Sequence, residues 1–203
     1  MLSLQQRFGE IDIYLFDQIL RGRIVTGMRI LDAGCGEGRN LIYLLRESYE
    51  VFGVDRDSDA VAELRRTAAY LAPTLPADNF QVGTVEGMKY PDGYFDFVIS
   101  SAVLHFARDD EHFHQMVNSS WRVLRAGGLL FCRLASSIGV EKQIKQIAGR
   151  HFQLPDGSER YLVDEALLVR LTKELHAQLA DPIRTTVVQS QRAMTTWVIR
   201  KIA

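Results

Sequence analysis

The stretch that decides the fold runs from Ile30 to Asn40 and reads ILDAGCGEGRN. An apolar strand ends here in a turn with glycine at 34, 36 and 38, and a helix is expected directly after it. Glycine tolerates positive φ and leaves no side chain between the backbone and a ligand. The first turn of a helix also offers unpaired N–H groups. The stretch therefore predicts a ligand site at the end of a buried strand.

A dinucleotide site is the competing interpretation of this turn. Its fingerprint spaces the glycines as Gly-x-Gly-x-x-Gly so that a pyrophosphate can lie on the helix N-terminus. In this chain the third glycine, Gly38, comes one residue early. Asp32 also stands directly before the turn, where it would repel a pyrophosphate. The spacing and the acidic residue favour a ligand with a cationic group over a dinucleotide.

Short apolar strands alternate with amphipathic helices over most of the chain. This alternation is typical of α/β proteins in which helices cover a mostly parallel sheet. Two strand-like runs near the end of the chain, joined by a short polar connection, predict an antiparallel C-terminal hairpin. The strands are predicted at 28–32, 51–55, 79–84, 95–100, 129–134, 185–189 and 194–200, and the helices at 11–20, 40–47, 59–71 and 110–125.

Length and charge limit the classes of protein that this chain can be. A chain of 203 residues can close a substantial core as a single domain over 1–203. Its formal net charge of −1 provides no electrostatic footprint for nucleic acid or an anionic membrane. The first residues lack the order of a signal peptide, and no apolar run approaches the roughly 20 residues that span a bilayer. We expect a cytoplasmic protein without a nucleic-acid or membrane partner.

Two segments fall outside the alternating core. Residues 1–27 are predicted to form a helical cap, which is dense enough in aromatic and aliphatic side chains to cover a site. Residues 135–165 hold Lys142, Lys145 and Arg150 around a predicted short helix, and they are interpreted as a lid with a preference for anionic ligands. A solvated helix face explains the same charges equally well.

Four motifs occur in the order that one enzyme family uses. They are Asp-x-Gly-x-Gly-x-Gly at 32–38, a strand with an acidic end at 51–55, PDGYFDFVIS at 91–100 and WRVLRAGGLL at 121–130. With these motifs the chain resembles the class I S-adenosylmethionine-dependent methyltransferases over residues 28–134 and, more weakly, over the C-terminal hairpin. The resemblance implies a Rossmann-like, doubly wound, mostly parallel seven-stranded sheet and S-adenosylmethionine as the cofactor.

The resemblance also implies roles in the cofactor site. Asp32 anchors the methionine end, while Asp55 accepts hydrogen bonds from both ribose hydroxyls, because a carboxylate can take two donors at once. The alternative role for Asp55 is to cap the next helix, for which Asp57 or Ser58 is better placed. Thr84 replaces the aspartate that contacts the adenine amino group in many relatives, which leaves one charge-assisted contact fewer. The predicted cofactor-binding residues are Asp32, Ala33, Gly34, Cys35, Gly36, Gly38, Asn40, Asp55, Arg56, Thr84, Val85, Glu86, Ser100 and Ser101.

The end of the fourth predicted strand bears on the methyl acceptor. Its sequence, Ser100-Ser101-Ala102-Val103, lacks the Asn/Asp-Pro-Pro-aromatic tetrapeptide of enzymes that methylate amide or base amino groups. No cysteine follows the strand, as a cytosine-C5 enzyme would need, and no carboxylate stands there to hold a divalent ion. We therefore predict a metal-independent transfer to an oxygen, nitrogen or sulfur atom of a small molecule.

Two side chains are candidates for contact with the acceptor. His105 follows the fourth strand and is the candidate general base, since its ordinary pKa lies near neutrality. Packing beneath the cofactor is the alternative for His105, and alignment alone suffices when the acceptor is already nucleophilic. Tyr14 in the cap is a candidate contact for either ligand, with ordinary packing as the alternative.

The pair His112 and His114 raises a metal site as a further hypothesis. On a regular helix, residues two apart point about 200° from one another, so the two imidazoles cannot share an ion. The pair is interpreted as a solvent-exposed helix start, and no metal site is predicted.

Two other functions are compatible with these residues. A non-catalytic protein could keep the S-adenosylmethionine pocket for regulation or for contact with a partner, because the sequence compels no catalytic residue. A nicotinamide-dependent oxidoreductase would have a similar sheet, but the glycine spacing disfavours it. Neither the acceptor nor the oligomeric state has a signal in the sequence.

Overall fold

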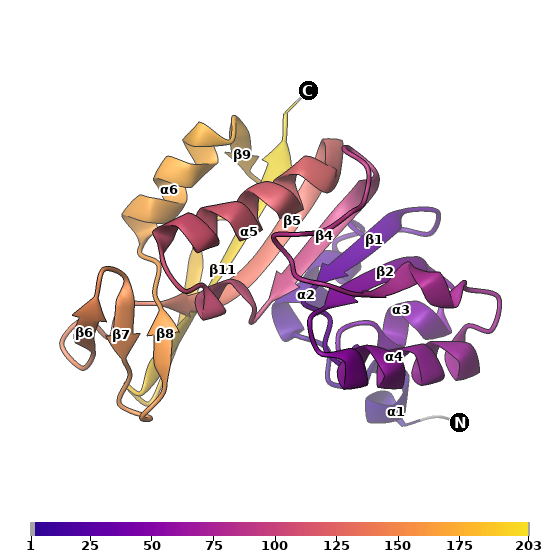
Figure 1. The fold of residues 1–203 in the computed structure, drawn as a ribbon, viewed down its shortest axis with the longest axis horizontal. Coiled ribbons are helices and arrows are strands. Elements are labelled where there is room, and N and C mark those ends of the chain that lie inside the picture. The colour runs from indigo at the N-terminus through magenta and orange to yellow at the C-terminus, as the bar shows by residue number, and fades with distance from the viewer. Residues whose placement is uncertain (1–2, 203) are drawn as a thin grey trace.

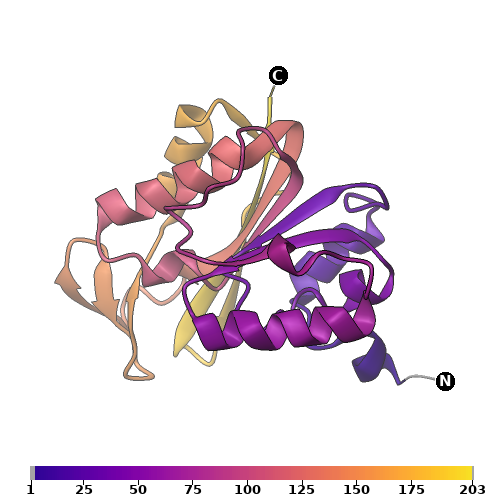
Figure 2. The same ribbon diagram turned by 45° about the vertical axis from the view of Figure 1, so that its right-hand side comes forward.

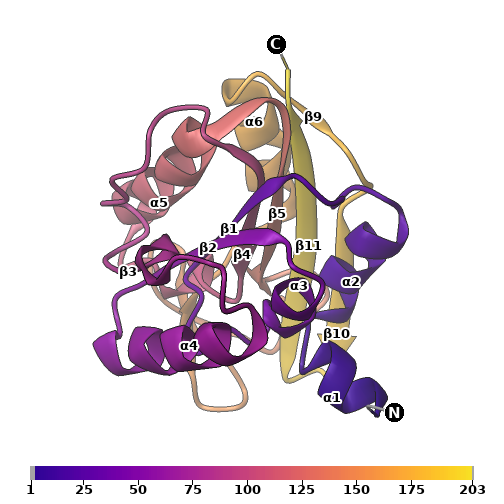
Figure 3. The same cartoon turned by 90° about the vertical axis from the view of Figure 1, so that its right-hand side faces the viewer.

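The computed structural model describes residues 3–202, which form three layers. A mixed β-sheet is the middle layer, with α5 (Asp110–Val123) and α6 (Glu165–Glu174) on one face. The other face is covered by α2 (Ile13–Leu20), α3 (Ile42–Arg46) and α4 (Ser58–Leu71), as Figures 1 and 3 show. This arrangement confirms the predicted α/β fold.

The sheet has the strand order β10-β11-β5-β4-β1-β2-β3. β1 to β5 pair in parallel, whereas β11 runs antiparallel to both β5 and β10. These seven strands and the C-terminal hairpin are the predicted ones, and the short strand β9 (Ala177–Leu179), which pairs with β11, is an unpredicted addition. The seven strands are β1 (Arg29–Ala33), β2 (Glu50–Asp55), β3 (Phe80–Val82), β4 (Phe95–Ser101), β5 (Leu124–Ser136), β10 (Arg184–Val188) and β11 (Arg192–Lys201).

The strand order brings the carboxyl ends of the parallel strands to one edge of the sheet, which we call the carboxyl edge. β1 lies in the middle, with β2 on one side and β4 on the other. In open α/β sheets the ligand site lies at the point where the strand order changes direction, outside the carboxyl ends. The topology therefore indicates that a ligand site would be formed by the residues that follow β1, β2 and β4.

Among the described residues, every α-helix except α3 begins at a residue whose side chain caps it. Asp57 caps α4 by accepting hydrogen bonds from Asp59 N and Ala60 N, as predicted. Asp109 caps α5, and its carboxylate accepts a hydrogen bond from His112 N at 2.7 Å. The predicted α5 helix runs to residue 125, but the chain already enters β5 at Leu124. Side chains of this kind satisfy N–H groups that a helix start leaves unpaired.

Two apolar clusters hold the layers together. On one face of the sheet, Phe113 and Met116 of α5 pack with Val98 and Leu130. On the other, Leu44 of α3 and Leu64 of α4 pack with Ile30 and Phe131. Burying one such side chain stabilises the fold by about 1.5–3 kcal/mol. Because successive residues of a strand alternate between the two clusters, the register of the sheet is well specified.

The N-terminal segment forms a helical cap, as predicted for residues 1–27 within the described part. It consists of α1 (Leu4–Phe8) and α2, which lie beside α3 and β10 in Figure 3. The connection before β10 holds α2 in place through the buried carboxylate of Asp181. That carboxylate accepts hydrogen bonds from Arg23 Nη1 at 2.7 Å and from Gln18 Nε2 at 3.0 Å.

The segment after β5 contains a second sheet. The short helix predicted around Lys145 and Arg150 is wrong, because this stretch forms strands β6 (Lys145–Ala148) and β7 (His151–Gln153). With β8 (Glu159–Tyr161) they make a small antiparallel sheet. Local hydrogen bonding between the strands replaces helical turns. Figure 1 shows it at the opposite end of the molecule from α4, and in Figure 2 it lies at the left-hand edge.

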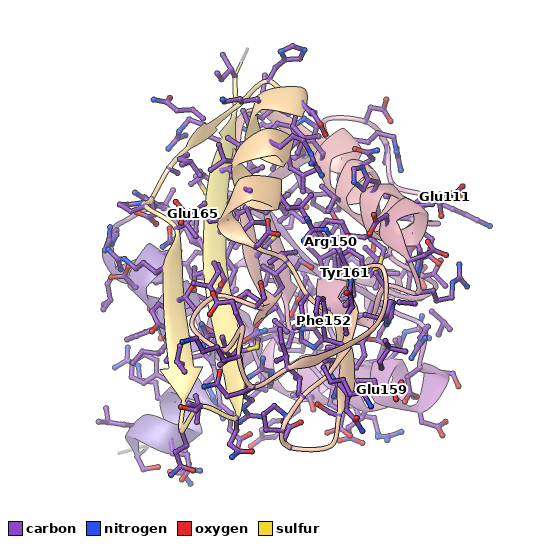
Figure 4. The ribbon with its side chains drawn as sticks, turned by 90° about the vertical axis from the view of Figure 1, so that its left-hand side faces the viewer. Glu111, Arg150, Phe152, Glu159, Tyr161 and Glu165 are labelled. Carbon is purple, nitrogen blue, oxygen red and sulfur yellow. The ribbon has the colours of Figure 1, made fainter. Side chains whose placement is uncertain are left out.

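Tyr161 anchors the small sheet to the body of the molecule. Its ring stacks on Phe113 with centroids 4.7 Å apart, and its hydroxyl donates to Asp110 Oδ1 at 2.8 Å. Arg150, which Figure 4 shows beside Tyr161, forms an ion pair with Asp164 at 2.9 Å. The β8 side of the small sheet is thus fixed to α5 and α6, while β6 is exposed along its length. Its role as a lid stays a prediction.

Candidate functional site

In the glycine turn after β1, two glycines lie where close packing leaves no room for a side chain, and the third faces open space. All three have positive φ, of 88° at Gly34, 50° at Gly36 and 83° at Gly38. A Cβ at Gly34 would lie 2.4 Å from Val103 Cγ2, and one at Gly38 would lie 2.4 Å from Leu64 Cδ1. At Gly36 no atom of the described residues would lie within 4 Å of an added Cβ. Gly36 therefore leaves room where a ligand can approach the backbone.

Asp55 stands at the end of β2 and faces the glycine turn. Its Oδ2 accepts a hydrogen bond from Gly36 N at 2.8 Å, and its Oδ1 accepts one from Asp57 N at 3.0 Å. Since Asp57 caps α4, Asp55 is free of that duty, as expected. A carboxylate has about four acceptor positions, so two backbone bonds leave Asp55 able to accept further donors.

A cleft of about 420 Å³ opens beside Asp55 on the α5 side of the carboxyl edge. We call it the strand-end cleft. Clefts of this size hold small-molecule ligands. It is lined by Gly34, Asp55, Arg56, Asp57, Thr84, Val85, Glu86, Ala102, Val103, Phe106, Arg108, His112 and Met116.

Six of the predicted cofactor residues line the strand-end cleft, and the others lie beside or behind it. Gly34, Asp55 and Arg56 are joined there by the consecutive residues 84–86. Cys35 is buried and packs on Gly53, where a Cβ would lie 2.8 Å from its Sγ. Burial raises the pKa of the Cys35 thiol, because the thiolate would lose its hydration. Cys35 contributes its backbone to the turn, and its side chain belongs to the core.

The turn after β4 supplies lining residues that sequence reasoning missed. Ala102 has φ +64°, a strained conformation for a residue with a Cβ. Its N–H donates to Arg133 O at 2.7 Å, which holds the turn against β5. The turn brings Val103 over Gly34 and leads to the half-exposed Phe106. The available signal was position alone, because these residues directly follow a strand at the carboxyl edge.

His112 also lines the cleft, so its interpretation as a solvent-exposed residue is wrong. Its side chain is 12% exposed, and Nε2 lies 3.2 Å from Glu86 Oε1. Its Nδ1 accepts a hydrogen bond from Arg108 N at 3.1 Å, so the proton of the neutral ring sits on Nε2. The pKa of Glu86 is lowered, since its bonds to the backbone, His112 and Thr84 outweigh its partial burial. This contact joins the first turn of α5 to the segment after β3.

Asp32 is a buried carboxylate without a partner. It is 1% exposed, and neither of its oxygens has a hydrogen-bond partner among residues 3–202. Burial raises its pKa to about 7, against the opposing influence of the Arg39 charge. The hydroxyl of Ser100 on β4 is likewise buried and unpartnered within the described chain. An unsatisfied buried polar group is costly, and it is well explained by a ligand that supplies the missing donor.

A group of polar side chains lies on the α2 side of the carboxyl edge, and we call it the cap-side polar cluster. It comprises Asp12, Tyr14, Arg39, Asn40, Ser101, Arg133, Thr186 and Thr196. Ser101 of β4 lies opposite Arg133 of β5, which lies opposite Thr196 of β11. Asp12 and Tyr14 reach these strands from the cap.

Distances within the cap-side polar cluster show a closed network. Arg133 Nε lies 2.9 Å from Asp12 Oδ2, and Arg133 Nη1 donates to Thr196 Oγ1 at 3.3 Å. The Tyr14 and Thr186 hydroxyls are 2.6 Å apart, so the predicted ligand contact of Tyr14 is occupied by a protein partner. Asn40 Oδ1 accepts from Asp12 N at 3.1 Å. The predicted residues Asn40, Ser101 and Tyr14 therefore meet here, apart from the strand-end cleft.

His105 lies in the short 3₁₀ helix η2 (Leu104–Phe106) and is 6% exposed. Its Nδ1 accepts a hydrogen bond from Ala135 N at 3.2 Å. Burial, with a smaller effect of Arg160, lowers its pKa to about 4. The imidazole is thus neutral at neutral pH, but the lone pair that a base would use is engaged by β5. The catalytic role of His105 stays a prediction, and this geometry supports the packing alternative.

Within residues 3–202, no three His, Cys, Asp or Glu side chains are grouped so that they could hold a metal ion. None of the helices in that range is both long and apolar enough to cross a membrane.

Known proteins resemble the part of the chain that builds this site. A family model described as a methyltransferase domain matches residues 31–132, half of the chain. Over 140 residues the chain is 31% identical to malonyl-(acyl-carrier protein) O-methyltransferase of Enterobacter lignolyticus, covering 68% of this chain and 51% of that protein. The chain spans about a third to a half of the length of the curated relatives that it matches.

Solved structures share the fold. A structure described as a SAM-dependent methyltransferase of Methanosarcina mazei has a TM-score of 0.74 at 20% identity, covering 91% of this chain and 97% of that chain. The 1,6-didemethyltoxoflavin-N1-methyltransferase of Burkholderia thailandensis has a TM-score of 0.72 at 16% identity, covering 99% and 82%. That second structure was solved with S-adenosylhomocysteine bound.

Proposed function

Because this chain belongs to the S-adenosylmethionine-dependent methyltransferase family, we propose that it transfers a methyl group to an oxygen, nitrogen or sulfur atom of a small molecule without a metal ion. The family's cofactor is S-adenosylmethionine. When bound, it supplies an electrophilic methyl group on a sulfonium ion. The acceptor atom and the absence of a metal are the parts that need a test.

The observation that carries the proposal is the unpartnered carboxylate of Asp32 at the end of β1, just before the glycine turn. The amino group of the cofactor's methionine moiety is a cation with three donors, which suits a buried carboxylate that has no partner among residues 3–202. At the other side of the glycine turn, Asp55 keeps acceptor positions for the two ribose hydroxyls. Gly36, whose N–H donates to Asp55, leaves open space at the turn. The residues present thus fit the cofactor.

The chain's own residues would act by binding and alignment. Glu86 is held by His112 at the side of the cleft where Thr84 and Val85 would frame the adenine. The cap covers the opposite side of the carboxyl edge and excludes water from it. Positioning of an already nucleophilic acceptor can supply a large part of the rate enhancement, so no general base is required. A small-molecule acceptor is supported by the cleft's modest size and by the named substrate of the Burkholderia protein.

Calorimetry tests the cofactor half of the proposal. S-adenosylhomocysteine should bind in the micromolar range, on the order of −7 to −8 kcal/mol. NAD is the matched control, because it shares the adenosine moiety but has a pyrophosphate that Asp32 and the early Gly38 disfavour. Equal binding of NAD and S-adenosylhomocysteine would contradict the proposal.

An acceptor screen tests the transfer itself. The protein is incubated with S-adenosylmethionine and a library of small molecules, and the release of S-adenosylhomocysteine is measured. Turnover should persist after exhaustive chelation with EDTA, since serines occupy the strand end where a metal enzyme needs carboxylates. Loss of turnover that magnesium restores would show that a metal takes part. Cofactor binding without turnover on any acceptor would favour a non-catalytic role.

A further inference from the structure

Arg133 is a positive charge in a place where a parallel sheet usually has apolar side chains. It lies on β5 directly opposite Ser101, and its side chain is 15% exposed. Its guanidinium lies over the Tyr14 ring, with Cζ 4.5 Å from the centroid. Its neighbours on β4 and β11 are the polar residues Ser101 and Thr196, but the side chain is largely buried, so the charge loses most of its hydration. A guanidinium in such a position needs an anionic partner.

Asp12 is that partner in the ligand-free protein. Its side chain is 8% exposed, and its Oδ2 lies 2.9 Å from Arg133 Nε. Its Oδ1 has a different task, because it accepts a hydrogen bond from Tyr14 N at 2.9 Å and so caps α2. Capping alone does not need a charge, since serine and asparagine cap helices as well as aspartate does. The helix cap thus does not need Oδ2 of Asp12, and this oxygen pairs with Arg133.

The two partners belong to different layers of the molecule. Arg133 is fixed in the sheet by its hydrogen bond to Thr196 and by the pairing of β5 on both sides. Asp12 belongs to the cap, and its own polar contacts with the carboxyl edge are to the side chains of Asn40, Ser101 and Arg133. Buried ion pairs of this kind contribute little net stability, because desolvation offsets the attraction. The pair therefore adds little to the stability of the fold, and its main consequence is that a charged group is fixed at the carboxyl edge.

We propose that Arg133 is a carboxylate-binding residue and that Asp12 occupies this position as an internal stand-in until a ligand carboxylate replaces it. The planar guanidinium fork matches a carboxylate in geometry and charge. Two carboxylates can reach the carboxyl edge: that of the cofactor's methionine moiety and that of a carboxylic-acid acceptor. The identity of the carboxylate rests on the proposed function, whereas the carboxylate site itself does not.

Chemical rescue tests the carboxylate site without knowledge of the ligand. Asp12→Ser keeps a hydroxyl that can cap α2 but removes the charge and leaves space beside Arg133. Sodium acetate at 100 mM should then raise the melting temperature of the variant by about 2–5 °C relative to sodium chloride of equal ionic strength. The wild type and the double variant Asp12→Ser/Arg133→Gln should show no such difference. Asp109→Ser, which alters the exposed cap of α5, is the matched control. Equal effects of acetate and chloride on Asp12→Ser would overturn the proposal.

A comparison of two nucleosides identifies the source of the carboxylate. S-adenosylhomocysteine carries the methionine-derived carboxylate, and 5′-methylthioadenosine lacks the whole amino-acid moiety. If the cofactor's carboxylate binds Arg133, Arg133→Gln should weaken S-adenosylhomocysteine by about 10- to 100-fold and leave 5′-methylthioadenosine unchanged. If the acceptor's carboxylate binds there, both nucleosides should bind the variant as they bind the wild type. Failure of the wild type to bind S-adenosylhomocysteine would overturn the proposed function and leave the acetate result standing.

The direction in which Asp12→Asn changes ligand affinity distinguishes this role from a purely structural one. Asp12→Asn keeps the cap and removes the competing charge, so the ligand that uses Arg133 should bind about 3- to 10-fold more tightly. A structural pair would instead make Asp12→Asn and Arg133→Gln weaken binding alike, because both would loosen the cap. Parallel losses in the two variants would therefore overturn the proposal.

Discussion

The strand-end cleft and the cap-side polar cluster lie on opposite sides of the same carboxyl edge, yet one is open and the other is filled. The cleft is lined by backbone and by half-exposed side chains such as Glu86 and Phe106. The cluster is closed by Asp12 and Tyr14, which the cap inserts against Arg133. The same parallel strands thus support a preformed pocket on one side and a self-occupied site on the other.

The two sides show different ways of building a polar site at one sheet edge, an open half and a filled half. The open half consists of segments close in sequence to their strands, namely the glycine turn, Asp55 and residues 84–86. The filled half depends on the cap, because Asp12 of the cap supplies the negative charge that neutralises Arg133. A preformed pocket can bind its ligand without rearrangement, while a self-occupied one must exchange an internal partner for a ligand. The following variants test whether this contrast holds.

Asp32→Asn should have the largest effect on stability. The pKa of Asp32 rises from 3.8 to about 7 on folding, so the folded state keeps a proton that the unfolded chain loses near pH 4. Stability is therefore lost as the pH rises from about 4 through 7, and above that window the buried charge costs about 4 kcal/mol. The ligand-free variant should be more stable than the wild type at pH 8 and equal to it near pH 4, as measured by urea unfolding.

The same variant should bind S-adenosylhomocysteine more weakly, because an amide cannot neutralise an ammonium group. Asp59→Asn, an exposed change in the first turn of α4, is the control and should alter neither property. If Asp32→Asn destabilises the protein at pH 8, other groups of the folded chain already stabilise the Asp32 carboxylate, which would contradict its proposed role as a site for a ligand cation.

Asp55→Ala should cost about 1.5–3 kcal/mol of S-adenosylhomocysteine affinity, or roughly 10- to 100-fold. The loss follows because two ribose hydroxyls would be left without their charged acceptor. Calorimetry measures the change, and 5′-methylthioadenosine should lose the same factor, since it has the same ribose. If the Asp55→Ala variant binds both nucleosides as the wild type does, the ribose site does not lie at the end of β2.

Gly36→Ala separates backbone strain from ligand approach. Gly36 and Gly22 both have positive φ and open space around an added Cβ among the described residues, but Gly22 lies far along the chain from the turn. Each alanine should therefore destabilise the fold by a similar amount, about 1–2 kcal/mol. Only Gly36→Ala should also weaken S-adenosylhomocysteine, by about tenfold. Equal affinities in the two variants would show that the ligand does not pass close to Gly36.

His105→Asn should have the smallest effect, because the asparagine oxygen can take over the hydrogen bond from Ala135 N. We expect kcat to stay within a few-fold of the wild type once an acceptor is known, and we expect His105→Ala to lose about 1–3 kcal/mol of stability. A general base would instead give a fall of about 10²–10⁴-fold in the asparagine variant. The rate would then decline below an apparent pKa near 4, where the imidazole protonates.

The fold class and the strands along the chain were predictable from the sequence, whereas the cofactor-site residues stay a prediction. Apolar runs of strand length between helical periods predict a parallel sheet, and a parallel sheet gathers its strand ends at one edge. The glycine turn and Asp55 lie directly at those ends, so a local pattern was enough to locate them. The second sheet at 145–161 escaped prediction because its strands are short and exposed, which leaves almost no alternation of apolar residues.

The cap-side polar cluster could be decided only by the tertiary structure. Tyr14 and Thr186 stand 172 positions apart, and no pattern in the sequence relates them. Arg133 reads as a polar interruption in an apolar strand until the register shows Ser101 on one side of it and Thr196 on the other. His112 likewise looked exposed until Glu86 was found beside its ring. By itself the sequence determined which residues follow each strand, because that depends on local periodicity. Which charges meet across the carboxyl edge depends on how the cap packs on the sheet, and only the folded chain decides that.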